Sequence, residues 1–264
     1  MDLTRDELLS SKIVFTHVSK AGGSSLFGLF DALLGPERCF RHFARDAKTG
    51  KFSRKIEDLQ VEEVNAFNFL GGHFDYGHHA RIAGRVFYIG TMRDPVDRII
   101  SSFYYLRLQG PEKLRAEAMS MTLNDYVQSK LEDPNSRIVR SSQVEQLTGE
   151  KTAEAAKAVI EEHYLACCSL EQLDAMQALL AGLYGKPEVT PFRLNVTKAV
   201  KAHPDLTLDT LETLHERFEE DYRLLAWVRD RFDRVYRHLQ VADDAANPAS
   251  AKTKRGGFPL FRSL

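Results

Sequence analysis

The feature that most constrains this chain is a pattern that occurs twice: an apolar run typical of a strand, a short polar turn, and a helical repeat. The first copy begins with residues 13–25, Ile-Val-Phe-Thr-His-Val-Ser-Lys-Ala-Gly-Gly-Ser-Ser. The second copy begins with Arg85–Gly90 and continues through Thr91–Leu106. Strands that alternate with helices in this way are typical of α/β folds with a parallel sheet. The sequence therefore predicts an α/β domain.

The turn of the first copy has the composition of an anion-binding site. Gly22 and Gly23 allow the backbone to approach an anion closely, and the first N–H groups of the following helix point toward it. The hydroxyls of Ser24 and Ser25 can donate further hydrogen bonds, and Lys20 adds a mobile positive charge. The turn predicts a nucleotide or a related phosphorylated ligand. For this segment alone, a glycine turn without a ligand is the alternative.

The spacing of this turn argues against an ATP-binding P-loop. That loop reads Gly-x-x-x-x-Gly-Lys-Ser/Thr, with the lysine directly after the last glycine. Here Lys20 comes before Gly22 and Gly23, and His17 stands where the first glycine belongs. We therefore expect a phosphate-binding turn of another kind.

The second copy supplies a second candidate phosphate site. Asp94 suits an N-cap and Pro95 suits the first position of a helix. Arg93 lies just before that helix, and Ser101 lies about two turns along it. A guanidinium and a hydroxyl can bind phosphate oxygens together. The alternative is that Arg93 only pairs with Asp94 or Asp97.

Taken together, Ser19–Ser25 and Arg93–Ser101 resemble the two donor-binding motifs of sulfotransferases that use 3′-phosphoadenosine 5′-phosphosulfate. The chain looks most similar to the carbohydrate branch that contains the heparan and chondroitin uronyl 2-O-sulfotransferases, although Ser19 stands where that branch has proline. The resemblance implies a P-loop-like three-layer α/β domain with a central parallel sheet flanked by helices. It also implies that the first turn holds the 5′-phosphosulfate, while Arg93 and Ser101 hold the 3′-phosphate. The donor contacts implied are Lys20, Ala21, Gly22, Gly23, Ser24, Ser25, Arg93 and Ser101.

A late polar segment, Phe192–Lys198, lies where members of this family often place a loop over the donor nucleotide. Its candidate donor contacts are Arg193, Asn195, Thr197 and Lys198. The alternative is a surface loop between helices.

The candidate catalytic base comes from a third segment, Gly71–Gly77, which resembles the family segment that carries the catalytic histidine. His73 stands at the matching position. A histidine has an unperturbed pKa of roughly 6.5, so it can take a proton from an acceptor hydroxyl near neutral pH. His17 is expected to be structural. In this scheme His73 is the base and Lys20 stabilises the charge on the leaving phosphate.

The other polar residues near His73 leave alternatives open. Asp75 could orient the imidazole or could form a turn, and His78 and His79 could touch an anionic acceptor or be solvated. A metal site built from these four residues is a further interpretation. It leaves both phosphate motifs unexplained, so we predict no metal.

Composition limits the organisation and partners of the chain. Its 264 residues, 43% of them apolar, are enough for one continuous core. We expect one domain over residues 1–240 and a flexible tail over 241–264, where small and polar residues prevail. A net charge of −1 argues against nucleic acid as a partner. The predicted partner is a hydroxyl-bearing acceptor, a glycan or a small molecule. Basic residues between 38 and 55 could receive an acidic glycan or could be a solvated loop.

The cysteines and the first residues bear on the compartment. Only three cysteines occur, Cys39, Cys167 and Cys168, which is no disulfide framework and fits a reducing compartment. The opening residues, Met-Asp-Leu-Thr-Arg-Asp-Glu, have neither the apolar core of a signal peptide nor a membrane span. We expect a cytoplasmic protein.

Three functional hypotheses follow. The leading one is sulfuryl transfer from 3′-phosphoadenosine 5′-phosphosulfate to an acceptor hydroxyl of a carbohydrate. The second is an ATP-dependent, kinase-like phosphotransferase. The third is a non-catalytic protein that binds the donor nucleotide.

Overall fold

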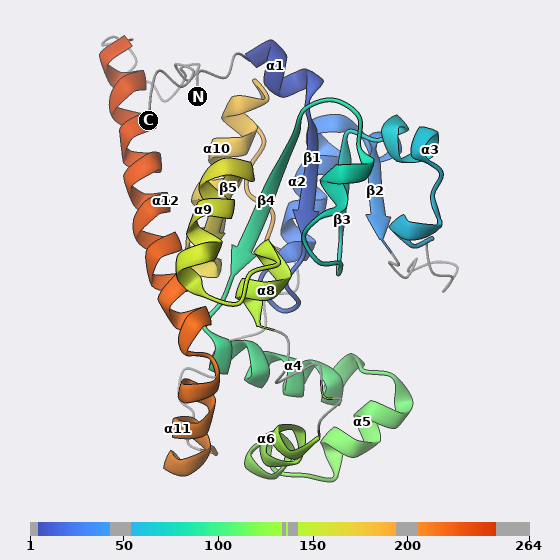
Figure 1. The fold of residues 1–264 in the computed structure, drawn as a ribbon, viewed down its shortest axis with the longest axis vertical. Helices are drawn as coiled ribbons and strands as arrows, with labels where there is room; N and C mark the ends of the chain where they lie inside the picture. Colours follow the sequence, from blue (N-terminus) through green and yellow to red (C-terminus); the bar gives the residue numbers. More distant parts are fainter. Residues whose placement is uncertain (1–4, 43–53, 134–135, 137–141, 194–204, 247–264) are drawn as a thin grey trace.

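The computed structural model describes residues 5–42, 54–133, 136, 142–193 and 205–246. Within these residues, five parallel strands form one sheet in the order β2-β3-β1-β4-β5 (Figure 1). The strands are β1 (Lys12–Thr16), β2 (Cys39–His42), β3 (Phe69–Gly72), β4 (Val86–Met92) and β5 (Tyr164–Ser169). This confirms the predicted α/β architecture with a central parallel sheet.

Helices flank the sheet and continue beyond one of its ends. They are α1 (Arg5–Ser10), α2 (Gly23–Leu34), α3 (Val61–Ala66), α4 (Pro95–Gln109), α5 (Glu112–Met119), α6 (Leu123–Glu132), α8 (Gln143–Thr148), α9 (Ala153–His163), α10 (Leu173–Leu183), α11 (Leu208–Arg217) and α12 (Glu219–Ala246). Short 3-10 turns cover Pro36–Arg38, Ile56–Asp58, His78–Arg81 and Leu170–Gln172.

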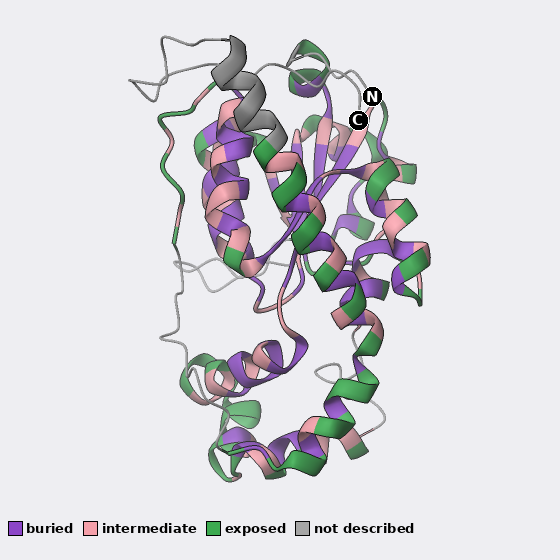
Figure 2. Cartoon of the chain, turned by 90° about the vertical axis from the view of Figure 1, so that its left-hand side faces the viewer, coloured by how far each residue is buried: buried purple, intermediate pink, exposed green. Residues whose placement is uncertain are grey.

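Two apolar layers cover the two faces of the sheet. Along β1, Ile13 and Phe15 pack with α2 and α10, while Val14 faces the opposite core with α8, α9 and α12. The strands are therefore buried on both sides (Figure 2). A parallel sheet needs this arrangement, which explains why its strands read as continuous apolar runs. The predicted three layers are confirmed.

A third apolar cluster joins α4, α5, α6 and α11. Its centre contains Phe103 of α4, Tyr126 of α6 and Leu214 of α11, all of them buried. Figure 1 places these helices beyond the end of the sheet toward which the strand arrows point, with α12 running from α11 along the β5 side of the sheet. Helix α4, which begins with the second phosphate motif, therefore lies between the sheet and this cluster.

The order of the strands determines where a ligand can bind. From β1 the chain passes through α2 to β2 at one edge of the sheet, whereas from β4 it passes through α4 to α9 and reaches β5 at the other edge. Connections that diverge from two neighbouring parallel strands open a crevice outside their carboxyl ends. The loops after β1 and β4 meet at that crevice, and the loop after β3 lies on the other side of β1.

The last described helix extends past residue 240, where we expected the domain to end. Helix α12 continues to Ala246, past residue 240, so the change in composition at residue 241 does not mark the end of the helix. The rest of the expected tail, residues 247–264, lies outside the described residues. Among the helices that the structure describes, none is both long and apolar enough to cross a membrane.

A buried carboxylate connects α12 to α8. Asp221 accepts hydrogen bonds from the backbone N–H of Gln143 at 2.9 Å and of Val144 at 3.0 Å, and from the hydroxyl of Ser142 at 2.6 Å. These are the donors at the start of α8 that have no partner within the helix. Burial lowers the pKa of Arg98 on α4, and the nearby charge of Asp221 opposes that shift. Asp221 therefore stabilises the start of α8 and compensates a buried cation.

We expect Asp221→Ala to lower the free energy of unfolding by about 3 kcal/mol, because it leaves buried donors and a buried guanidinium without their carboxylate. The control is Asp230→Ala on the same helix, which removes an exposed ion pair with Arg234 and should cost no more than about 1 kcal/mol. Denaturant titration of both variants measures the difference. Equal losses would contradict the role assigned to Asp221.

Candidate functional site

The turn after β1 leaves the start of α2 without a side-chain cap. Lys20 has φ 66° and Gly22 has φ 86°, so the chain turns through two residues in the left-handed region. Gly22 is the N-cap, and it has no side chain that could accept from the first-turn N–H groups. That turn also contains no acidic residue. The start of α2 therefore has uncapped N–H groups and a positive dipole end, the features at which an anion can bind.

Packing behind the turn explains why it contains two glycines. A Cβ atom on Gly23 would lie 2.0 Å from Nε2 of His17, and one on Gly22 would lie 2.6 Å from Cδ2 of Leu173. Neither position has room for a side chain. The imidazole of His17 therefore lies directly against the turn after β1.

Lys20 and Arg93 bring the two predicted phosphate motifs together. Nη1 of Arg93 donates to the backbone carbonyl of Lys20 at 3.1 Å. Nζ of Lys20 lies 3.9 Å from the centre of the ring of Tyr105, which comes from α4. Burial lowers the pKa of Lys20, and the charge of Arg93 lowers it further. The two cations repel each other, and an anion bound between them would relieve that repulsion.

The backbone of Arg93 is held by a residue that sequence reasoning missed. The N–H of Arg93 donates to Oε1 of Gln143 at 3.0 Å, and Nε2 of Gln143 donates to the carbonyl of Arg93 at 2.7 Å. Gln143 is fully buried. Ser101, the predicted partner of Arg93, is buried in α4, but no hydrogen bond within the described part of the chain joins the two residues. Asp94 caps α4 as expected, accepting from the N–H of Asp97 at 3.0 Å.

His17 and His73 form a stacked pair. Thr16 lies opposite Gly72 in the pairing of β1 with β3, so the next residue of each strand is again a neighbour. The two imidazole rings lie 4.1 Å apart between centroids, with an interplanar angle of 23°. The expectation that His17 is only structural is therefore incomplete, because it contacts the predicted base directly.

A hydrogen bond determines which nitrogen of His73 can act as a base. Nδ1 of His73 lies 2.8 Å from the carbonyl oxygen of His17. A carbonyl can only accept, so Nδ1 carries the proton and Nε2 of the neutral ring keeps a free lone pair. This carbonyl, rather than Asp75, therefore holds the imidazole in place. Asp75 is exposed.

The surroundings keep both histidines neutral near pH 7. His73 remains accessible to solvent, yet the protein atoms around its ring remove part of its hydration, and this loss lowers its pKa below the usual 6.5. The hydrogen bond to His17 opposes the shift, while the charges of His42 and Lys20 add to it. Burial lowers the pKa of His17 far more, and the charge of His73 lowers it further. In such a pair, the first proton goes to His73.

The other two histidines of this segment face different neighbours. Nε2 of His78 lies 3.6 Å from Oε1 of Glu57, and Nδ1 of His79 lies 3.0 Å from the hydroxyl of Tyr88. In the parts of the chain that the structure describes, no group of three or more His, Cys, Asp or Glu side chains is arranged to hold a metal ion.

The late polar segment is only partly described. Arg193 forms an ion pair with Asp174 of α10. The remaining predicted donor contacts lie outside the described residues: Asn195, Thr197 and Lys198.

Two members of the basic cluster between residues 38 and 55 have acidic partners. Arg41 pairs with Asp31, and Arg54 pairs with Glu63 at 2.5 Å. These contacts reduce the local positive charge, so a glycan-binding role for this cluster stays a prediction.

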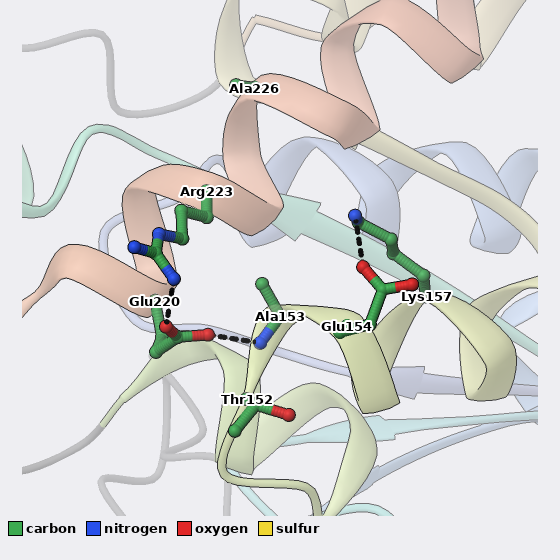
Figure 3. Close-up of a pocket in the computed structure, with 7 residues that line it drawn as sticks. All are labelled: Thr152, Ala153, Glu154, Lys157, Glu220, Arg223 and Ala226. Atoms are coloured by element: carbon green, nitrogen blue, oxygen red, sulfur yellow. Dashed lines mark hydrogen bonds and ion pairs between the residues drawn. The ribbon is translucent and has the colours of Figure 1, made fainter.

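A separate pocket lies between α9 and α12 (Figure 3). Its charged groups satisfy each other, since Glu220 contacts both Arg223 and the N–H of Ala153, and Lys157 pairs with Glu154 at 2.7 Å. The lining residues are Thr152, Ala153, Glu154, Lys157, Glu220, Arg223 and Ala226. None of the predicted site residues lines it, and it is no candidate for the phosphate site.

Comparison with known proteins identifies the family to which this chain belongs. A search of curated proteins finds no match. The model of the sulfotransferase family, however, matches residues 9–154 of the 264. This span contains the turn after β1, His73, Arg93, Ser101 and α8. Because the match covers more than half of the chain and includes the strands that carry these residues, the protein belongs to the sulfotransferase family.

Proposed function

We propose that this protein transfers a sulfuryl group from 3′-phosphoadenosine 5′-phosphosulfate to a hydroxyl of a carbohydrate acceptor. The observation that carries the proposal is an imidazole hydrogen-bonded through Nδ1 at the same end of the sheet as two cations that lie together. His73 lies after β3, while Lys20 and Arg93 lie after the neighbouring strands β1 and β4. No described ion pair joins either cation to a carboxylate, an arrangement that suits a polyanionic ligand. Membership of the family supports sulfuryl transfer in general.

The residues at the crevice fit a donor with two anionic ends. The N–H groups at the start of α2, Lys20, and the hydroxyls of Ser24 and Ser25 would hold the phosphosulfate. Arg93 and Ser101 would hold the second phosphate. The missing cap of α2 supports the first assignment. The second rests on the charge of Arg93 and on the resemblance of its motif.

The chemistry assigned to these residues is an in-line substitution at sulfur. Nε2 of His73 accepts the proton of the acceptor hydroxyl as its oxygen bonds to sulfur, and the bond between sulfur and the bridging oxygen of the donor breaks. Lys20 stabilises the negative charge that develops on the departing phosphate oxygen. The carbonyl of His17 keeps its hydrogen bond to Nδ1 and so stabilises the imidazolium that forms.

The acceptor would approach from the side of β2 and β3. The donor residues lie after β1 and β4, whereas His73 lies after β3, so the acceptor hydroxyl must reach His73 from the side away from Arg93. Arg41 and His42 lie near the carboxyl end of β2 on that side of the sheet. Arg41 already pairs with Asp31, and burial lowers the pKa of His42, so an acidic sugar as acceptor rests on the carbohydrate branch that the motifs resemble.

Ligand binding tests the donor. Adenosine 3′,5′-bisphosphate at about 100 times its Kd should stabilise the fold by about 2.7 kcal/mol, which raises Tm by several degrees. ATP with Mg²⁺ should stabilise it less. Stabilisation by ATP and not by the bisphosphate would favour a kinase-like phosphotransferase. Donor binding without transfer to any acceptor would favour a non-catalytic binding protein.

Substitutions separate the base from the donor contacts. His73→Ala should lower kcat by about 10² to 10⁴-fold, the usual contribution of a general base, with donor affinity nearly unchanged. Lys20→Ala and Arg93→Ala should weaken binding of adenosine 3′,5′-bisphosphate by about tenfold or more. Calorimetry and sulfated-product assays measure the two effects, with exposed His215 on α11 changed to Ala as the control. An equal loss of donor binding in the His73 variant would count against its role as the base.

The pH profile tests the protonation state of His73. The neutral ring is the active form, so the rate falls as pH drops through the pKa of the folded protein. Because that pKa lies below 6.5, the acid limb of kcat/KM should inflect below pH 6.5. An inflection at or above 6.5 would contradict the assignment, as would an acid limb that persists unchanged in residual His73→Ala activity.

A further inference from the structure

We infer that Gln143 and Gln146 of α8 are positioning residues, the first for the donor contact Arg93 and the second for the stacked histidine pair. The two side-chain amides lie one turn apart on the same helix. This inference rests on the proposed function, because it assigns Arg93 to the donor and His73 to the proton transfer.

Gln143 supplies the backbone partner that Arg93 lacks. Strand β4 ends at Met92, whose neighbour on β5 is Ser169, and α4 begins at Pro95. Between these elements, neither the sheet nor the helix satisfies the backbone groups of Arg93. The amide of Gln143 contacts both of them, at 3.0 Å and 2.7 Å. The amide of Gln143 therefore replaces the strand partner that the backbone of Arg93 lacks, and it fixes the position from which the guanidinium extends.

Gln146 contacts the carbonyl that orients the base. Its Nε2 donates to the carbonyl of His17 at 3.2 Å, and the same oxygen accepts from Nδ1 of His73 at 2.8 Å. A carbonyl oxygen has two lone pairs, so it can serve both donors. The backbone carbonyl of Gln146 also accepts from the N–H of Tyr76 at 3.0 Å. Helix α8 therefore contacts both the carbonyl that orients His73 and the backbone three residues after His73.

Helix α8 is itself held firmly. Asp221 caps its first turn. Val144 and Leu147 are fully buried, and the hydroxyl of Tyr164 donates to the carbonyl of Leu147. Because this short helix is fixed at its start and along its buried face, its two side-chain amides are held in place against Arg93 and His17. A packing role alone would not require both amides to point at these two backbone sites.

Two variants separate the two roles. Gln143→Met keeps the size of the side chain and removes both hydrogen bonds, so binding of adenosine 3′,5′-bisphosphate should weaken by about tenfold while kcat at saturating donor stays within about twofold. Gln146→Met should leave bisphosphate binding unchanged and lower kcat by about tenfold. It should also move the acid limb of kcat/KM to higher pH, because the carbonyl of His17 then serves His73 alone. Calorimetry and pH–rate profiles provide the readouts.

Controls keep the test decisive. Asn65→Leu removes an amide that donates to the carbonyl of Val61 and accepts from the N–H of Ala83. These residues precede β3 and β4 in the chain, so they lie away from the carboxyl ends of the strands. The change should alter neither binding nor the pH profile. If Gln143→Met does not fold, Gln143→Asn keeps an amide but shortens the side chain by one methylene, which draws the amide away from the backbone of Arg93, and it should also weaken binding. Wild-type protein that does not bind the bisphosphate would overturn the proposed function. Wild-type binding that folded Gln143 variants retain, or a Gln146→Met variant with an unchanged acid limb and kcat, would overturn this inference.

Discussion

The hydrogen-bonded pairing of β1 with β3 on one side and β4 on the other is the constraint on which the site depends. Thr16 lies opposite Gly72 and also opposite Gly90. The carboxyl ends of parallel strands all lie at the same end of the sheet, so loops from three distant parts of the sequence converge there. A shift of the β1–β3 register by one residue would turn His17 and His73 to opposite faces and destroy their stacking.

The convergence of these loops brings together polar and charged side chains that would be more stable apart in water. Lys20 and Arg93 repel each other, and loss of hydration disfavours charge on Lys20, His17 and His73. The repulsion and the partial burial of Lys20 make the ligand-free site less stable, and the two buried layers and the contacts of Asp221 must compensate for it. Such local conflict is typical of sites built to bind and transform a ligand. The same loss of hydration favours the neutral form of both histidines.

Local signals were enough to predict both strand–turn–helix segments and most of the fold. Glycine, an N-cap and an apolar stripe act within a few residues, so the turn from Lys20 and the helix from Pro95 could be placed from sequence. The stacking of His17 on His73 depends on strand register, which no local pattern contains. Gln143 and Gln146 gave no signal at all, because their contacts reach residues 50 and 129 positions away. Helix α12 continues to Ala246, into the segment of polar composition that begins at residue 241.

The contact between Lys20 and Tyr105 lowers the affinity of any anion that draws Lys20 away from the ring. With the ring 42% exposed and Nζ 3.9 Å from its centre, such a contact is worth about 0.5–1 kcal/mol. Any anion that draws Lys20 from the ring must first offset this amount, so its apparent affinity falls by about two- to fivefold. A small singly charged ion has little attraction to spare, whereas a ligand that also contacts Arg93 and the start of α2 loses only a small part of its binding free energy. The contact thus lowers the affinity of every such ligand by the same factor, and a ligand with several charges can bear this loss and still bind.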